Sequence, residues 1–151
     1  MEQEFIQLLG KQSFHTGIDL VGDSGSNILN VKAGEVTWAG WQNAYGNCVE
    51  VKHIGDGGNV FYTFYAHMRD NSICVQKGQK IVEGQVLGVQ GTTGNSTGDH
   101  LHFEIRLEDK STIDPAEYLF EKIMNLQNYI KCGKIRVIQV FGEDLKFKKY
   151  N

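Results

Sequence analysis

Short β-like runs separated by glycine dominate this chain up to about residue 107. The sequence holds 18 glycines and one proline, a balance that suits many short strands joined by tight turns, where positive φ angles are often needed. Residues 101–107 show the strand pattern most clearly, because apolar and polar residues alternate there. Hydrophobic residues make up 40% of the chain, so disorder is not expected. The sequence therefore predicts a mainly β globular fold.

Three further strands are predicted before residue 70. Residues 34–41 are expected to place Val36 and Trp38 on one face of a sheet, and residues 48–54 alternate between apolar and polar side chains. Residues 60–68, VFYTFYAHM, are rich in aromatic residues, which is typical of strands. Between the last two, the glycines of Asp56-Gly57-Gly58 predict a hairpin turn.

The pattern changes after Asp114. Asp114 can cap a helix that has Pro115 at its first position, and Gly133 would end that helix. Residues 135–141 and 145–150 then suggest a hairpin. A chain of 151 residues is the ordinary size of one domain. We therefore expect a domain over residues 1–120 and a C-terminal extension over 121–151, a helix plus a hairpin, packed on the same domain.

Composition excludes several classes of function. The net charge is −3 and positive charge forms no stripe, so no nucleic-acid partner is expected. No apolar run approaches the length of a membrane helix, so no membrane span is expected. The N-terminal sequence MEQEFIQLLGKQ lacks the features of a signal peptide. The three cysteines form no CxxC pair, which argues against a thiolate zinc site and leaves one disulfide plus one free thiol open.

Four of the five histidines fall into three short motifs: HTGID at 15–19, YAHM at 65–68 and HLH at 100–102. Catalytic zinc typically takes three ligands from His, Asp and Glu and keeps a fourth position open. The first and last motifs can supply such ligands from distant parts of a fold. Since residues i and i+2 of a strand lie roughly 6.6 Å apart, spacing alone leaves open which histidine of HLH binds the metal. Glu104 shares their strand face and is a candidate to fix an imidazole tautomer.

These motifs resemble a known family. The segments FHTGIDL, YAHM and GTTGNSTGDHLHFEIR are similar to those of the lysostaphin-type (LytM-like) zinc peptidases that cleave bacterial peptidoglycan, over roughly residues 13–120. The resemblance implies antiparallel sheets that form a groove, and one zinc ion held by His15, Asp19 and His102. It also implies that His67 and His100 are the catalytic pair. Residues 1–120 would then be the zinc peptidase domain.

The resemblance predicts a zinc-dependent endopeptidase that hydrolyses peptide bonds in peptidoglycan stems or cross-bridges. The alternative is a non-catalytic or latent member that serves as a wall-binding module or amidase activator. The D-Ala-D-Ala carboxypeptidases share a metal set of two histidines and one aspartate, but their motif spacing differs. The site of action would be the extracellular cell wall or periplasm. Without a signal peptide, we expect either a phage or mobile-element protein or a fragment of a larger exported one.

Some residues carry a plainer interpretation. His53 ends a strand before a polar turn and is predicted to be structural or merely exposed. Tyr62, Phe64 and Tyr65 either line a substrate groove or divide between core and surface. Ser96 is not a nucleophile candidate, because no GxSxG elbow surrounds it. Asp99 stands where the family often has proline, and a carboxylate beside His100 would favour the imidazolium and raise the pH optimum.

Overall fold

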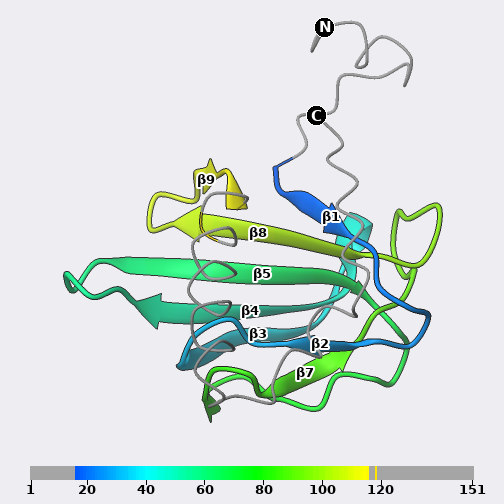
Figure 1. Cartoon of the computed structure of the whole chain (residues 1–151), viewed down its shortest axis with the longest axis horizontal. Helices are drawn as coiled ribbons and strands as arrows, with labels where there is room; N and C mark the ends of the chain where they lie inside the picture. The colour runs from blue at the N-terminus through cyan, green and yellow to red at the C-terminus, as the bar shows by residue number, and fades with distance from the viewer. Residues whose placement is uncertain (1–15, 116–117, 119–151) are drawn as a thin grey trace, which may run out of the picture.

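Antiparallel strands make up most of the described chain (Figure 1). The computed structural model describes residues 16–115 and residue 118. The predicted hairpin at 135–150 and almost all of the predicted helix therefore lie outside the described residues. The strands are β1 (Ile18–Leu20), β2 (Asn27–Leu29), β3 (Gly34–Gln42), β4 (Gly46–Ile54), β5 (Val60–Met68), β6 (Lys80–Ile81), β7 (Val86–Val89), β8 (Leu101–Leu107) and β9 (Thr112–Ile113), and a 3-10 turn, η1, spans Asn43–Tyr45.

The strands form two antiparallel sheets. The larger has the order β1-β8-β5-β4-β3-β6, with β9 beside β8, and the smaller consists of β2 and β7. The long strands β8, β5, β4 and β3 lie side by side, and β2 and β7 lie below them in Figure 1. The predicted hairpin turn joins β4 to β5 at residues 56–58, where Gly58 has a φ of 80°. The prediction of a mainly β, antiparallel fold is confirmed.

The hydrophobic core lies between the two sheets. Apolar side chains from alternate positions of the large sheet meet Ile28 of β2 and Leu87 of β7, which are 3% and 0% exposed. Burial of such side chains contributes roughly 1.5–3 kcal/mol each. From the large sheet the core takes Val36, Val49, Val51, Phe61, Tyr65, Met68, Ile81, Phe103 and Ile105.

Strand β8 has the two faces that its sequence predicts. Phe103 and Ile105 are each 1% exposed and belong to the core. On the opposite, outer face of the sheet, the side chains of His102, Glu104 and Arg106 are joined by hydrogen bonds. The core packing of one face thus presents a row of polar groups on the other.

Strand β3 differs from its prediction. Val36 is 1% exposed, but Trp38 is 39% exposed, so the two do not share a buried face. Val36 pairs with Val51 and Trp38 with the next residue of β4, Glu50, so one extra residue is inserted in β3. Such a β-bulge reverses the alternation of faces beyond it. The prediction for Val36 and Trp38 was therefore wrong, and Ala39, opposite Val49, takes the inward position.

The end of the described chain agrees with the predicted helix start. Pro115 and Tyr118 are helical, and the ring of Tyr118 lies 6.0 Å from that of Phe61. Cys48 is a buried free thiol and Cys74 an exposed one, whereas Cys132 lies outside the described residues. Within residues 16–115 and 118, we find no helix long and apolar enough to cross a membrane.

Candidate active site

Asp19 and His102 face each other on neighbouring strands. They are partners in the register of β1 and β8, and Oδ1 of Asp19 lies 2.9 Å from Nδ1 of His102. Strand pairing thus brings together two of the predicted metal ligands from positions 83 residues apart. The third, His15, lies outside the described residues.

The second ring nitrogen of His102 faces Glu104. Nε2 of His102 lies 2.9 Å from Oε1 of Glu104, which is 1% exposed. When Nε2–H donates to this carboxylate, a neutral ring directs its Nδ1 lone pair toward Asp19. Burial works against the imidazolium, but the hydrogen bonds to Asp19 and Glu104 outweigh it and raise the pKa of His102 to about 9.

Glu104 is the centre of a hydrogen-bonded cluster. Its Oε1 also accepts bonds from the hydroxyls of Thr16 and Tyr45, the latter at 3.1 Å, and its Oε2 accepts one from Nε of Arg106 at 2.6 Å. Burial alone would raise the pKa of Glu104, but the bonds from His102, Thr16 and Arg106 lower it to about 2. Glu104 is therefore a carboxylate at neutral pH.

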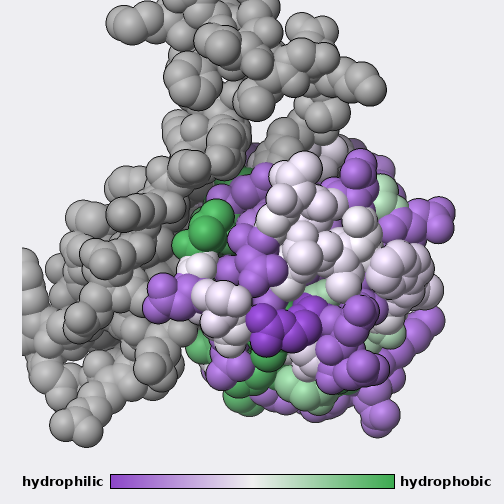
Figure 2. Space-filling view, turned by 90° about the vertical axis from the view of Figure 1, so that its right-hand side faces the viewer, coloured by the Kyte–Doolittle hydropathy of each residue, from purple (hydrophilic) through white to green (hydrophobic). Residues whose placement is uncertain are grey.

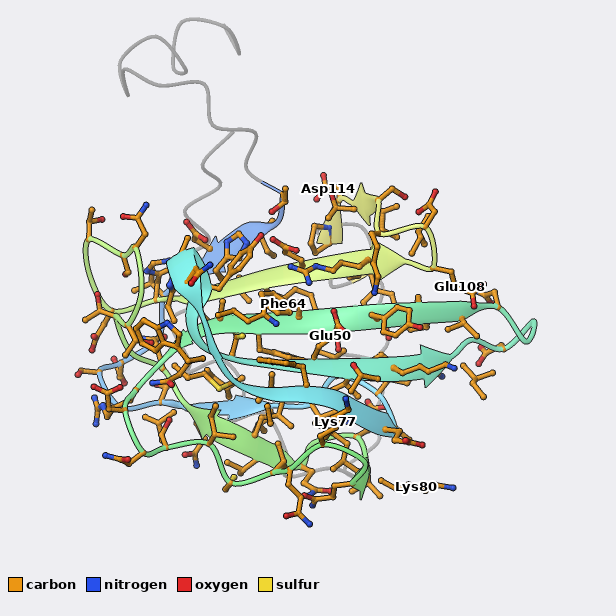
Figure 3. All side chains as sticks on the ribbon, turned by 180° about the vertical axis from the view of Figure 1, so that it is seen from behind. Glu50, Phe64, Lys77, Lys80, Glu108 and Asp114 are labelled. Carbon is orange, nitrogen blue, oxygen red and sulfur yellow. The ribbon has the colours of Figure 1, made fainter. Side chains whose placement is uncertain are left out.

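Arg106 holds this cluster against the sheet. One terminal nitrogen of Arg106 lies 3.2 Å from Oε2 of Glu50, and its guanidinium carbon lies 3.7 Å from the centre of the Phe64 ring. Glu50 and Phe64 are register partners on β4 and β5, and Figure 3 shows them near the middle of the sheet. A guanidinium over an aromatic face is attracted by the ring quadrupole, so Arg106 is fixed by an ion pair on each side and a ring beneath.

The Asp19–His102 pair suits a zinc ion. Carboxylate oxygen and imidazole nitrogen are both zinc ligands, and two ligand atoms of a tetrahedral site lie about 3.3 Å apart. The observed separation of 2.9 Å is close to that value. Among residues 16–115 and 118, no group of three His, Cys, Asp or Glu side chains could hold a metal ion. The predicted third ligand, His15, is not among these residues.

His67 reaches the site through a bulge in β5. Asn47 pairs with Met68 but Val49 pairs with Tyr65, so β5 carries one extra residue at this point. His67 itself has a φ of 60°, a left-handed conformation that is uncommon outside glycine and often found at functional sites. Because the bulge interrupts the alternation, Tyr65 and Met68 both enter the core while the ring of His67 lies on the outer face near His100.

The tautomer of His67 is set by a backbone carbonyl. Nδ1 of His67 lies 2.7 Å from the carbonyl oxygen of Thr93. A carbonyl only accepts, so Nδ1 carries the hydrogen and Nε2 of the neutral ring keeps its lone pair. Burial lowers the pKa of His67, although the bond to Thr93 acts in the opposite direction.

His100 is held in the same way. Its Nδ1 lies 2.8 Å from the carbonyl oxygen of Gly98 and 3.3 Å from the hydroxyl of Ser96. Its Nε2 faces the site, 3.7 Å from Oδ1 of Asp19. Asp99 accepts a hydrogen bond from Ser24 at 3.0 Å, and its expected effect on His100 stays a prediction.

The two predicted catalytic histidines are neighbours. The ring centres of His67 and His100 lie 4.7 Å apart, and those of His67 and His102 lie 6.0 Å apart. Both His67 and His100 donate Nδ1–H to the backbone, so Nε2 is the nitrogen of each ring that can accept or return a proton. The structure therefore groups four of the five predicted site residues: Asp19, His67, His100 and His102.

The remaining candidates His53, Phe64 and Tyr65 are all buried. His53 is fully buried and lies 3.0 Å from the Ala33 carbonyl and 2.7 Å from the Thr63 hydroxyl, so the structural interpretation is confirmed. Tyr65 is a core residue, whereas Phe64 is buried on the outer face. Tyr45, Thr16 and Thr93 were missed as contributors to the site, because single hydroxyl residues in loops carry no spacing signal.

Comparison with known proteins gives this geometry a context. Residues 13–115 match the sequence profile of peptidase family M23. The chain belongs to peptidase family M23. Its fold is similar to the catalytic domain of the antimicrobial peptidase lysostaphin from Staphylococcus simulans, with a TM-score of 0.61 and 29% identity over 70% of this chain and 78% of that one.

Two curated relatives differ in what their names describe. This M23 chain is 38% identical to the DD-carboxypeptidase/endopeptidase Mpg of Neisseria meningitidis over 93 residues, which are 62% of the chain and 20% of Mpg. It is 35% identical to the murein hydrolase activator NlpD of Escherichia coli over 122 residues, which are 78% of the chain and 30% of NlpD. The chain thus spans well under half of either relative.

Proposed function

We propose that this chain is a zinc-dependent endopeptidase that hydrolyses peptide bonds in bacterial peptidoglycan, in stem peptides or cross-bridges. The observation that carries the proposal is the juxtaposition of two histidines, each with its Nδ1–H committed to the backbone, beside an imidazole–carboxylate pair of metal-donor atoms. The names of lysostaphin and Mpg, a peptidase and a carboxypeptidase/endopeptidase, support the same class of reaction.

In the proposed site, His15, Asp19 and His102 hold the zinc ion. When bound, zinc supplies Lewis-acid chemistry that polarises the scissile carbonyl and acidifies water. Glu104 holds His102 through Nε2–H and so keeps Nδ1 directed at the metal position. The ion pair with Arg106 keeps Glu104 ionised and in place.

The proton transfers fall to His67 and His100. Nε2 of one ring accepts a proton from the attacking water, and the same proton or its equivalent passes to the leaving amine nitrogen. The other ring, when protonated, donates a hydrogen bond to the oxygen that gains negative charge as the carbonyl carbon becomes tetrahedral. The backbone bonds at Thr93 and Gly98 keep both Nε2 atoms aimed into the site.

Digestion of purified cell walls of several chemotypes tests the proposal, with mass analysis of the new termini. The expected result is release of peptide termini that a chelator abolishes and added zinc restores. New carboxyl termini within stems or bridges would identify the bond, and loss of a terminal residue alone would indicate carboxypeptidase action. Full activity of chelator-treated, metal-free protein would contradict the proposal.

The second candidate function is activation of another murein hydrolase. It is favoured by the similarity to NlpD, which extends over 78% of the chain. Retention of all five residues of the predicted site argues for catalysis instead. A His100→Ala variant separates the two functions: a hydrolase loses its own wall-degrading activity, whereas an activator without catalytic function keeps its effect on a partner enzyme.

A further inference from the structure

Thr93 connects three parts of the site that are distant in sequence. Its hydroxyl accepts a hydrogen bond from the backbone N–H of Asn47 at 3.0 Å and donates one to the carbonyl of Met68 at 2.5 Å. Its own carbonyl oxygen accepts the Nδ1–H of His67 at 2.7 Å. One residue thus contacts β4, the end of β5 and an imidazole of the proposed catalytic pair.

The contacts of the Thr93 hydroxyl lie at the β-bulge of β5. Asn47 and Met68 are the register partners at which the bulge of β5 begins. The Thr93 hydroxyl bridges the N–H of Asn47 to the carbonyl of Met68 at the point where β5 carries its extra residue. Without that extra residue, strand alternation would turn the side chain of residue 67 toward the core.

The loop that carries Thr93 is itself seated on the turn between β3 and β4. The N–H of Asn95 donates to the carbonyl of Ala44 at 2.7 Å. A Cβ added at Gly46 would lie 2.4 Å from the carbonyl carbon of Thr93, and one added at Gly94 would lie 2.3 Å from the nitrogen of Gly46. The backbones of Gly46 and of residues 93–94 therefore lie in close contact, which requires glycine at both positions.

The same loop also fixes the second histidine, through Gly98 and Ser96. Figure 1 shows it as the loop that projects at the right, between β7 and β8. Seen from that end, in Figure 2, the described surface is mostly hydrophilic or near neutral in hydropathy.

We propose that Thr93 is a positioning residue: its hydroxyl maintains the bulge that places His67 on the outer face, and its carbonyl holds His67 in the Nδ1–H tautomer. The inference rests on the proposed function for its effect on rate, but its effect on the tautomer does not depend on that function. Thr93→Val keeps the shape of the side chain and removes the oxygen that bridges Asn47 and Met68. Thr93→Ser keeps that oxygen.

The test compares these variants in the full 151-residue chain, with and without added zinc. Long-range proton–nitrogen NMR correlations report the tautomer of His67, and hydrolysis of cell-wall peptide gives kcat and KM. Thr93→Val is expected to mix or invert the His67 tautomer and to lower kcat about 10- to 100-fold, because small displacements of catalytic groups have effects of this size. KM and zinc content are expected to stay within about twofold, since the lost bridge contacts neither substrate nor metal ligands.

Thr93→Ser is expected to restore both the tautomer and kcat. Thr112→Val, the same chemical change at an exposed position of β9, is the control and should behave as the unmodified chain. If Thr93→Val fails to fold, Thr93→Ala is used in its place. Thr93→Ala removes the same oxygen without adding a methyl group. A Thr93→Val protein that retains the Nδ1–H tautomer overturns the inference, whatever its rate. An inactive unmodified chain would refute the proposed function and leave the tautomer comparison decisive for Thr93.

Discussion

Nε2 of His102 lies 2.9 Å from Oε1 of Glu104, two residues further along the same strand. This contact joins a proposed metal ligand to a carboxylate that is 1% exposed and is itself paired with Arg106. Partners of this kind commonly orient a ligand and tune its affinity for metal. The outer face of β8 is therefore a connected unit from the metal position to the middle of the sheet.

Replacing Glu104 with glutamine tests that unit. Glu104→Gln keeps the size of the side chain but removes the charge that accepts Nε2–H of His102 and pairs with Arg106. We expect zinc affinity to fall about 10- to 100-fold, measured by competition with a chelator of known affinity. Glu108→Gln, the same change at an exposed position just beyond β8, is the control. Equal zinc affinity of the two variants would show that Glu104 does not orient His102.

The acid limb of the pH–rate profile should report the protonation of His67. Burial lowers the pKa of His67 from the ordinary value of 6.5. Because a general base acts in its neutral form, the rate should be retained below pH 6.5 and lost as the pH falls through this lowered pKa. The measurement is kcat between pH 4.5 and 8, with the zinc content of the protein followed in parallel. A half-maximal kcat above pH 6.5 while zinc stays bound would contradict this assignment.

His53 should matter for stability and not for metal binding. It is fully buried, with one ring nitrogen at the Ala33 carbonyl and the other at the Thr63 hydroxyl. His53→Gln is expected to lower the free energy of unfolding by about 1–3 kcal/mol, the usual effect of leaving buried polar groups unsatisfied. Denaturant titration measures this, and Lys52→Gln, at the exposed neighbouring position, should change stability by less than about 0.5 kcal/mol. Loss of zinc binding in His53→Gln at full stability would reverse the interpretation.

The two described cysteines should differ in reactivity. Burial raises the pKa of the Cys48 thiol to about 12, and the thiolate is the reactive form. Between pH 7 and 9.5, iodoacetamide should therefore alkylate the exposed Cys74 and leave Cys48 unmodified, as read by peptide mass spectrometry. In denaturant both should react. Alkylation of Cys48 in the folded chain at the rate of Cys74 would show that the face of the sheet around Cys48 opens to solvent.

Local patterns were enough to predict several elements. The alternation of β8, the aromatic strand β5 and the turn at 56–58 all follow from short-range rules, because side-chain direction in a regular strand has a period of two. The metal and histidine candidates came from motif spacing and from resemblance to a family. Of these, Asp19, His67, His100 and His102 are neighbours in the fold. The place of His15 stays a prediction.

Two β-bulges explain the side-chain directions that sequence periodicity did not predict. An extra residue in β3 puts Trp38 on the face opposite Val36, and an extra residue in β5 puts His67 beside His100 instead of in the core. Neither insertion can be recognised from periodicity, because each depends on which residue of β4 lies opposite.

The sequence alone was enough to predict which residues can bind a metal or transfer a proton. It also predicted most of the strands that carry them. The directions of the ring nitrogens were decided by hydrogen bonds of the folded chain, some of them between distant segments. The carbonyl of Thr93 fixes Nδ1 of His67, and the carbonyl of Gly98 fixes Nδ1 of His100. The carboxylates of Asp19 and Glu104 lie at the two ring nitrogens of His102. The physical reason is that the direction of a ring nitrogen depends on its hydrogen-bond partner, and the partners Thr93 and Asp19 come from distant parts of the chain.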